Sequence, residues 1–232
     1  MKAFVITVRG HKQDELQSDI CLRSLAEFDG WEPEQLYGYT AKDKDLFEDR
    51  WGFPMIENAR LRAFEKEDKN RYLTKKACFY NHVRLWEKCI ELDEPIAFIE
   101  SDVVCIRPWE EPEWKEVLIL NIEAAMSNER GPIGPTNEEL KSYRDGLQYG
   151  IHSFHRAPTK YHRDNRMKGY AHNPGNGAYA FTPQGAKRLL KAAKNGIDQG
   201  DLFVNASNVK MQYVYPSYFV FSGPNQGLSH GF

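Results

Sequence analysis

The pattern of apolar and polar positions between residues 73 and 108 predicts a long helix followed at once by a buried strand. Apolar or weakly polar side chains recur at three- and four-residue steps, the spacing that places them on one face of a helix. These positions are Cys78, His82, Leu85, Trp86, Cys89 and Leu92. Asp93-Glu94-Pro95 then ends the helix, because proline disfavours a helical conformation in the residue before it. The unbroken apolar run over residues 96–99 is typical of a strand buried on both faces.

Two carboxylates follow that strand directly, in the order Glu100-Ser101-Asp102. In an open α/β sheet, ligands bind in the crevice beyond the carboxyl ends of the strands. Residues two apart in an extended segment point the same way, so Glu100 and Asp102 can approach one hard cation such as Mg²⁺ or Mn²⁺. The segment therefore predicts a metal site. The competing interpretation is an acidic turn that simply ends a strand.

Helical spacing of apolar residues and short apolar runs also occur in the rest of the chain, and they predict further strands and helices. The predicted strands cover residues 3–8, 35–41, 117–122, 178–181, 212–215 and 218–221, and the other predicted helices end at 29–30, span 138–147 and begin after 182. Thr182 is the expected cap of the last helix, with Pro183 in its first turn and Asn195-Gly196 at its end. We therefore predict one α/β domain over residues 1–232, with a central, mostly parallel sheet flanked by helices.

Composition narrows the class of protein. A chain of 232 residues with 41% hydrophobic and 13% aromatic residues supplies the core of one folded α/β domain. The net charge of -2 gives no global reason to expect a nucleic-acid binder, and the absence of a GxGxxG motif argues against a dinucleotide fold. The four cysteines show no metal-ligand spacing, there is no secretory signal, and the apolar runs are too short to span a bilayer. We therefore expect a cytoplasmic protein with reduced cysteines, and the oligomeric state stays open.

Two blocks of the sequence carry a family resemblance. The first has KKAC at residues 75–78, then an Asn-His pair, a tryptophan and the run IAFIESD that ends at Asp102. The second has GNGAYAFTPQGAKRLL at residues 175–190, followed by an acid at Asp198. In their order and separation these blocks resemble glycosyltransferase family 25, the lipopolysaccharide-type sugar transferases that have a GT-A fold.

The resemblance implies a single Rossmann-like GT-A domain that moves a sugar from a nucleoside-diphosphate donor, with UDP expected, to a hydroxyl acceptor. It also implies dependence on Mn²⁺ or Mg²⁺, inversion by direct displacement, and a saccharide acceptor such as lipopolysaccharide. Three positions depart from the family pattern: Ser101 stands where the pattern has an acid, Lys75-Lys76 replaces Gly-Glu, and Asn81 replaces Ser. Because the usual residue at position 101 is acidic, we expect Ser101→Asp to be tolerated.

Donor-binding candidates come from the strand ends and from the first matching block. They are Thr7, Arg9, Tyr39, Lys75, Lys76, His82 and Ser101. The guanidinium of Arg9 can make paired hydrogen bonds to phosphate, and the ring of Tyr39 can stack on a base. Lys75 and Lys76 are expected near a helix N-terminus, which favours an anion. The competing interpretations are a solvated loop arginine, a half-buried strand tyrosine and a solvent-facing lysine pair.

The candidates for catalysis lie after the last predicted helix. The resemblance places a functional aspartate there, so Asp198 or Asp201 is the expected general base that takes the proton of the acceptor hydroxyl. Either residue would serve equally as the cap of a turn. Many GT-A enzymes add a late histidine to the metal, and His230 is the only histidine after His172, although an exposed tail histidine is an equal alternative.

The segment over residues 152–172 combines positive charge with histidines and aromatic rings. Its five cations stand against the single acid Asp164. Such a segment is expected to bind an anionic acceptor, through Arg163, Arg166 and Lys168, or to close over the donor. The competing interpretation is a flexible basic surface loop.

Three other functions stay open from the sequence. The first is a phage-type DNA glycosyltransferase that acts on hydroxymethylated bases, which the basic segment favours and the balanced net charge does not. The second is a non-catalytic module that binds nucleotide sugars, because Ser101 alters the central motif. The third is a metal-dependent phosphoryl-transfer enzyme or hydrolase that uses the same two carboxylates.

Overall fold

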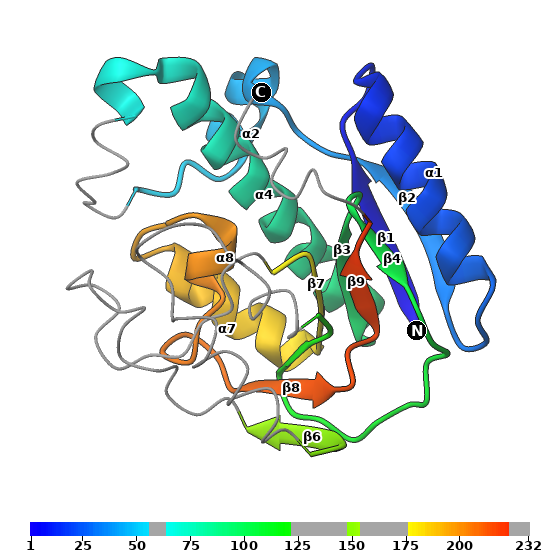
Figure 1. The fold of residues 1–232 in the computed structure, drawn as a ribbon. Coiled ribbons are helices and arrows are strands. Elements are labelled where there is room, and N and C mark those ends of the chain that lie inside the picture. The colour runs from blue at the N-terminus through cyan, green and yellow to red at the C-terminus, as the bar shows by residue number, and fades with distance from the viewer. Residues whose placement is uncertain (56–63, 122–147, 154–175, 223–232) are drawn as a thin grey trace, which may run out of the picture.

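The computed structural model describes residues 1–55, 64–121, 148–153 and 176–222, which form a central sheet with structure on both faces (Figure 1). Seven strands hydrogen-bond in the order β2-β1-β3-β7-β5-β8-β6. Their bounds, in that order, are Glu32–Tyr37, Lys2–Thr7, Ile96–Glu100, Ala178–Phe181, Val117–Ile119, Met211–Tyr215 and Gly150–Ser153.

Most of these strands run in the same direction. β2 and β3 both pair parallel with β1, and β5 pairs parallel with β8. β7 lies antiparallel between β3 and β5, and β6 lies antiparallel beside β8. Within the described part of this sheet only β6 and β7 therefore oppose the other strands, which confirms the predicted α/β fold with a mostly parallel central sheet.

The two faces of the sheet are covered by different elements (Figure 1). On one face lie α4 (Lys69–Leu92) and α7 (Pro183–Ala193), which pack against each other. On the other lie α1 (Lys12–Ala26) and a two-stranded antiparallel sheet of β4 (Val103–Cys105) and β9 (Phe219–Phe221). The central sheet is thus enclosed between two layers, which is why its middle strands are almost wholly apolar.

Successive residues of the strands alternate between two hydrophobic cores, as the pleat of a strand requires. Phe4 and Phe98 belong to the core beneath α4 and α7, while Val5 and Ile99 belong to the core beneath α1 and β4. Trp86 of α4 is fully buried in the first core. Burial of a large side chain of this kind stabilises the fold by roughly 1.5–3 kcal/mol.

Shorter helices connect these layers. They are η1 (Ala41–Asp43), α2 (Lys44–Arg50) and α8 (Gly200–Phe203). α2 is anchored to α4 by ring stacking, with Phe47 4.8 Å and Trp51 5.3 Å from the ring centroid of Tyr80. Within the described ranges, no helix has both the length and the apolar character needed to cross a membrane.

Several elements begin and end where the sequence pattern predicted. α4 ends at Leu92, and Asp93 follows it in the left-handed conformation with φ 50°. β7 has the predicted bounds, and the side chain of Thr182 caps α7 by accepting a hydrogen bond from the backbone N–H of Gly185 at 3.1 Å. The predicted helix over residues 138–147 lies outside the described residues.

Other bounds differ, for local physical reasons. α4 begins at Lys69, earlier than the apolar stripe indicated, because the side chain of Asp68 caps its first turn at Arg71 N. β2 begins three residues before the predicted strand, because it pairs residue for residue with β1. Its charged side chains are tolerated there because β2 is an edge strand of the sheet. β4 and β6 were not predicted, since β4 directly follows the acidic turn and β6 carries no apolar run.

Candidate functional site

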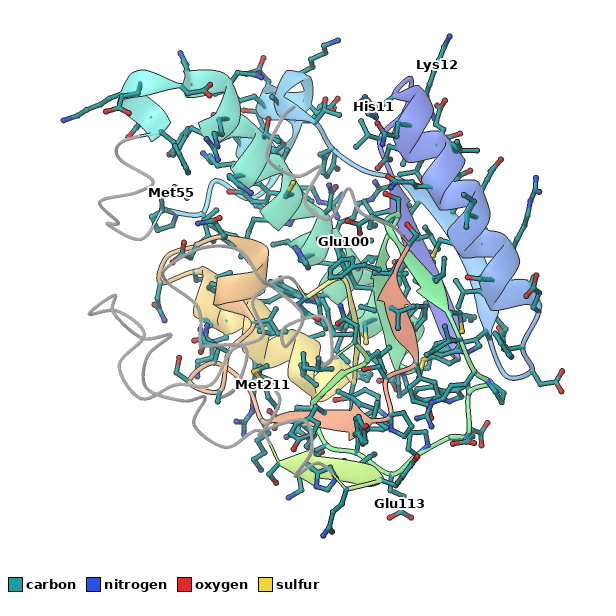
Figure 2. The ribbon with its side chains drawn as sticks, in the orientation of Figure 1. His11, Lys12, Met55, Glu100, Glu113 and Met211 are labelled. Carbon is teal, nitrogen blue, oxygen red and sulfur yellow. The ribbon has the colours of Figure 1, made fainter. Side chains whose placement is uncertain are left out.

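The Glu100-Ser101-Asp102 turn lies at the carboxyl end of β3, beside the end of β1 (Figure 2). The backbone N–H of Glu100 donates to the carbonyl of Gly177 at 2.7 Å, which ties the turn to the start of β7. The carbonyl of Asp102 accepts from both the backbone N–H and the hydroxyl of Ser222, at 2.8 and 3.0 Å. Hydrogen bonds from two separate segments therefore hold the backbone of this turn.

Asp14, in the first turn of α1, contacts the Glu100-Ser101-Asp102 turn. Its N–H donates to the ring Nδ1 of the capping residue His11 at 3.2 Å. One carboxylate oxygen accepts the hydroxyl proton of Ser101, with 2.5 Å between the oxygens, and the other accepts the backbone N–H of Val8 just after β1. The sequence analysis missed Asp14, because its distance from Ser101 along the chain gives no local signal.

The carboxyl group of Asp102 is unusual in two respects. Its Oδ1 is buried and has no hydrogen-bond partner among the residues that the structure describes. Burial raises the pKa of Asp102 to about 6, and the neighbouring charge of Asp14 adds to that rise, while a hydrogen bond to the backbone of Asp102 opposes it. An unpaired buried carboxylate oxygen costs free energy unless a ligand satisfies it.

Carboxylates such as those of Glu100 and Asp102 are ligands that a hard divalent cation accepts alongside other ligands of its own. In the described part of the chain, no three histidine, cysteine, aspartate or glutamate side chains form a ready-made metal centre. Glu100 and Asp102 would therefore supply only part of a coordination shell. Mg²⁺ is commonly held in this way, through one or two carboxylates with water and substrate phosphates completing the shell.

Thr7 and Arg9 differ in what their side chains contact at the end of β1. The hydroxyl of Thr7 is buried, 2.5 Å from the hydroxyl of Ser18 and 3.3 Å from the amide nitrogen of Gln35. Thr7 therefore joins β1 to α1 and to β2. Arg9 is exposed, and its guanidinium lies 4.2 Å from the ring centroid of Tyr37, at the end of β2. Arg9 thus places an exposed positive charge beside the carboxyl ends of β1 and β2.

Tyr39 is held in the loop after β2 by Asn81. The amide oxygen of Asn81 accepts from Tyr39 N–H at 2.6 Å, and its amide nitrogen donates to the Tyr39 carbonyl at 3.2 Å. The Tyr39 ring packs edge-on against Phe47 and Trp51. A side chain at Gly38 would meet the Asn81 amide at 2.8 Å. Asn81, where the family pattern has Ser, thus fixes the backbone of this loop.

Lys75 and Lys76 do not lie where the sequence analysis expected them. α4 begins at Lys69, so both lysines stand beyond its first turn and away from its unpaired N–H groups, and the expectation of a nearby helix N-terminus is wrong. The ammonium group of Lys76 lies 2.5 Å from Glu48 Oε1 with its side chain 10% exposed. Although burial opposes it, this hydrogen bond lowers the pKa of Glu48. The charge of Lys76 is therefore already matched.

His82 belongs to a buried network between α4 and β7. The indole N–H of Trp86 donates to the Tyr179 hydroxyl at 3.0 Å, and that hydroxyl lies 2.9 Å from His82 Nδ1. Because the indole can only donate, the Tyr179 hydroxyl accepts from Trp86 and shares a second hydrogen bond with His82 Nδ1. Burial lowers the pKa of His82 to about 3, so its ring is neutral at physiological pH.

The segment that carries the candidate bases, residues 198–201, lies against this network at His82. A Cβ at Gly200 would lie 2.3 Å from His82 Nε2, so α8 begins directly against the imidazole. Asp198 is buried, and its Oδ1 accepts the backbone N–H of Gln199 at 2.8 Å. Asp201 lies in α8. His82 therefore joins the two sequence blocks that carry the family resemblance.

The remaining candidates lie outside the described residues. They are Arg163, Arg166, Lys168 and His230. The structure thus brings together Thr7, Ser101, Asp102 and the unpredicted Asp14 at the ends of β1 and β3. His82 and the Asp198 segment meet on the α4 side of the sheet.

Two buried amides beyond the ends of β5 and β7 were also missed by sequence reasoning. When the Asn121 amide is oriented to satisfy both its atoms, it donates to Asn176 Oδ1 at 3.2 Å and accepts from Gly177 N at 3.0 Å. Gly177 admits no side chain, since a Cβ there would lie 2.7 Å from Val103. The signal for this arrangement was the Gly-Asn-Gly sequence at residues 175–177.

A separate cavity of about 310 Å³ lies at the opposite edge of the sheet, where β5 and β8 begin. Lys115, Arg188 and Lys210 line it, and Met211 forms part of its wall. Figure 2 shows Met211 well apart from Glu100. This cavity is therefore not part of the candidate site.

The sequence model of glycosyltransferase family 25 (LPS biosynthesis protein) matches residues 39–204. The match spans both resembling blocks and most of the chain, so the chain belongs to this family and is a glycosyltransferase. No curated protein matches the chain. Among solved structures, the apo crystal structure of mouse Xyloside xylosyltransferase 1 aligns with a TM-score of 0.38 and 8% identity, covering 88% of this chain and 80% of that one. So slight a likeness carries no argument about the site.

Proposed function

We propose that this glycosyltransferase moves a sugar from a nucleoside-diphosphate donor, UDP-linked, to a hydroxyl group of a saccharide such as lipopolysaccharide. The observation that carries the proposal is the Asp102 carboxylate, largely buried at the carboxyl end of β3 with one oxygen unpartnered among the described residues. That oxygen needs a ligand, and the strand ends around it are where an α/β sheet binds one. Family membership supports sugar transfer as the reaction.

Glu100 and Asp102 would hold Mn²⁺ or Mg²⁺ in this proposal. A bound divalent cation would offset the negative charge that develops on the departing diphosphate. Asp102 would act in its ionised form, which predominates above its pKa of about 6. The role proposed for His230 as a further ligand stays a prediction from the sequence.

Arg9 is the cation best placed to assist with the donor diphosphate. It is exposed beside the end of β1, whereas Lys76 is buried and already paired with Glu48. A guanidinium can make two parallel hydrogen bonds to phosphate oxygens, which also orients the donor. We therefore propose that Arg9, and not Lys76, binds the diphosphate of the donor.

The acceptor hydroxyl would be activated by Asp198 or Asp201. As the acceptor oxygen bonds to the anomeric carbon, its proton passes to the carboxylate and the bond to the diphosphate breaks on the opposite side of the sugar. The result is inversion at that carbon. Asp198 is supported by its buried position just before α8, whose first residue, Gly200, lies against His82.

The test is turnover of a panel of nucleotide sugars in the presence of Mn²⁺, with and without a chelator. Slow hydrolysis of one donor without acceptor is expected and should stop when the metal is removed. Asp102→Asn should reduce this turnover by about 10²-fold or more, because it removes the charge while keeping the size of the side chain. Asp49→Asn, at an exposed position of α2, is the matched control and should behave as the wild type.

Two outcomes would contradict the proposal. Turnover that is unchanged by the chelator would remove the metal from the mechanism. Binding of a nucleotide sugar without any turnover, with or without saccharide acceptors, would instead favour the non-catalytic binding module.

A further inference from the structure

Asp14 stands between the two strand ends that build the candidate site. One of its carboxylate oxygens accepts from the backbone after β1, and the other accepts from Ser101 after β3. Its own position is fixed by α1, because the N-cap residue His11 accepts its N–H. A single side chain therefore holds three segments of the site in register.

The contact with Ser101 depends on the charge at each position. The serine hydroxyl can donate to a carboxylate, whereas two ionised carboxylates can only accept. Ser101 is 7% exposed, so little water is available to screen a second charge. An aspartate at position 101 would therefore direct its carboxylate toward the oxygen that Ser101 now donates to. The geometry opposes the expectation, taken from the family pattern, that Ser101→Asp is tolerated.

We propose that Asp14 is a positioning residue of the candidate donor site, and that Asp14 and Ser101 form an interdependent pair in which only one position carries a negative charge. Asp14 supplies from α1 the carboxylate that position 101 lacks, and the Ser101 hydroxyl joins it to the Glu100-Ser101-Asp102 turn. The inference rests on the proposed function for the identity of the ligand. The pairing itself rests on geometry.

The pair predicts a specific pattern among four proteins. Asp14→Asn removes the charge and one of the two accepted hydrogen bonds, and Ser101→Asp adds a second charge. Each single variant should bind UDP in the presence of Mn²⁺ at least about 10-fold more weakly than the wild type, the scale of losing one charged hydrogen bond. The double variant Asp14→Asn/Ser101→Asp should recover most of that loss, because the new amide N–H can donate to the new carboxylate.

The measurements are calorimetric titration of Mn²⁺ and UDP and thermal unfolding of the apo proteins. Asp19→Asn, at an exposed position on the same helix, controls for the loss of one negative charge and should leave both unchanged. Ser101→Asp should lower the unfolding midpoint by about 5 °C, and the double variant should restore much of it. Recovery in the double variant separates a paired role from a general loss of structure.

Two results would decide against the inference. Near-wild-type binding by both single variants would remove Asp14 from the site. Losses that simply add in the double variant, in both binding and unfolding, would show that the two positions act independently. If the wild type bound no nucleotide with Mn²⁺, the proposed function would fail, whereas the unfolding data on the four proteins would still decide whether positions 14 and 101 are coupled.

Discussion

At the scale of single residues, polar side chains in this protein are buried where they join segments that are distant in the sequence. His82 is the clearest case, because it stacks on Phe98 with ring centroids 4.0 Å apart and contacts β7 and α8 as well. The sequence identified His82 through its family motif and its place on the packed stripe of the helix, but not through its contact with Tyr179. The sequence pattern of a histidine on the apolar stripe of a helix is the same whether the side chain faces a ligand or a buried tyrosine.

The buried neutral state of His82 predicts a loss of stability in acid. The pKa of His82 falls from 6.5 to about 3 on folding, so between these values the unfolded chain binds a proton that the folded chain does not. Stability is therefore fully present above pH 6.5 and declines as the pH falls toward 3, by up to about 4 kcal/mol from this group.

The measurement is chemical denaturation of the wild type and His82→Asn between pH 7.5 and 4. The variant should be less stable at pH 7.5, because it loses the ring packing, but its stability should fall less steeply with pH. His152→Asn removes a histidine from the edge strand β6 without touching the buried network and serves as the control. Equal slopes for the wild type and His82→Asn would contradict the predicted pKa.

At the scale of elements, the apolar pattern predicted elements that bury a continuous stripe or run and missed several that tertiary contacts define. α4 and β7 followed from their apolar patterns, since each buries a continuous stripe or run. β4, β6 and α8 have only three or four residues each, and tertiary contacts define them. The sequence likewise placed Asp102 at a strand end but could not find Asp14, because the pairing of the two segments is a property of the sheet.

The contact between α8 and α4 predicts that Gly200 admits no side chain. A Cβ at position 200 would lie 2.3 Å from the imidazole of His82, which is held by stacking and cannot withdraw easily. Gly200→Ala should therefore displace the segment that carries Asp198 and Asp201. Displacement of about 1 Å can cost about 10²-fold in rate, so transfer to the acceptor should fall by that order.

The affinity of Gly200→Ala for the donor is the control for its transfer rate. Mn²⁺-dependent affinity for UDP should change little, because Arg9 and Asp102, which we propose bind the donor and the metal, lie at the ends of β1 and β3. The double variant Gly200→Ala/His82→Asn, in which the side chain facing the new methyl group is smaller, should regain part of the transfer rate. A Gly200→Ala protein with normal transfer would show that α8 does not position the base.

At the scale of the whole molecule, the acceptor is the least determined partner. Within the described residues, the candidate site is the one we propose for the donor. The acceptor residues Arg163, Arg166 and Lys168 lie outside those residues, so their role stays a prediction from the sequence. The net charge of -2 offers no general attraction to a polyanion, and the segment over residues 152–172 is the candidate that the sequence offers for a local one.

Salt dependence separates the two kinds of acceptor. A DNA acceptor would be bound largely through counterion release, so affinity for duplex DNA would fall steeply between low salt and about 0.15 M. Replacing Arg163, Arg166 and Lys168 together by Ala would then weaken that binding and flatten its salt dependence, with UDP affinity little changed. The proposed saccharide acceptor predicts no measurable DNA affinity at about 0.15 M salt, where surface charges are screened beyond about 8 Å. An anisotropy titration with a duplex at two salt concentrations distinguishes these outcomes, and tight, salt-dependent binding that the triple variant loses would replace the saccharide acceptor with DNA.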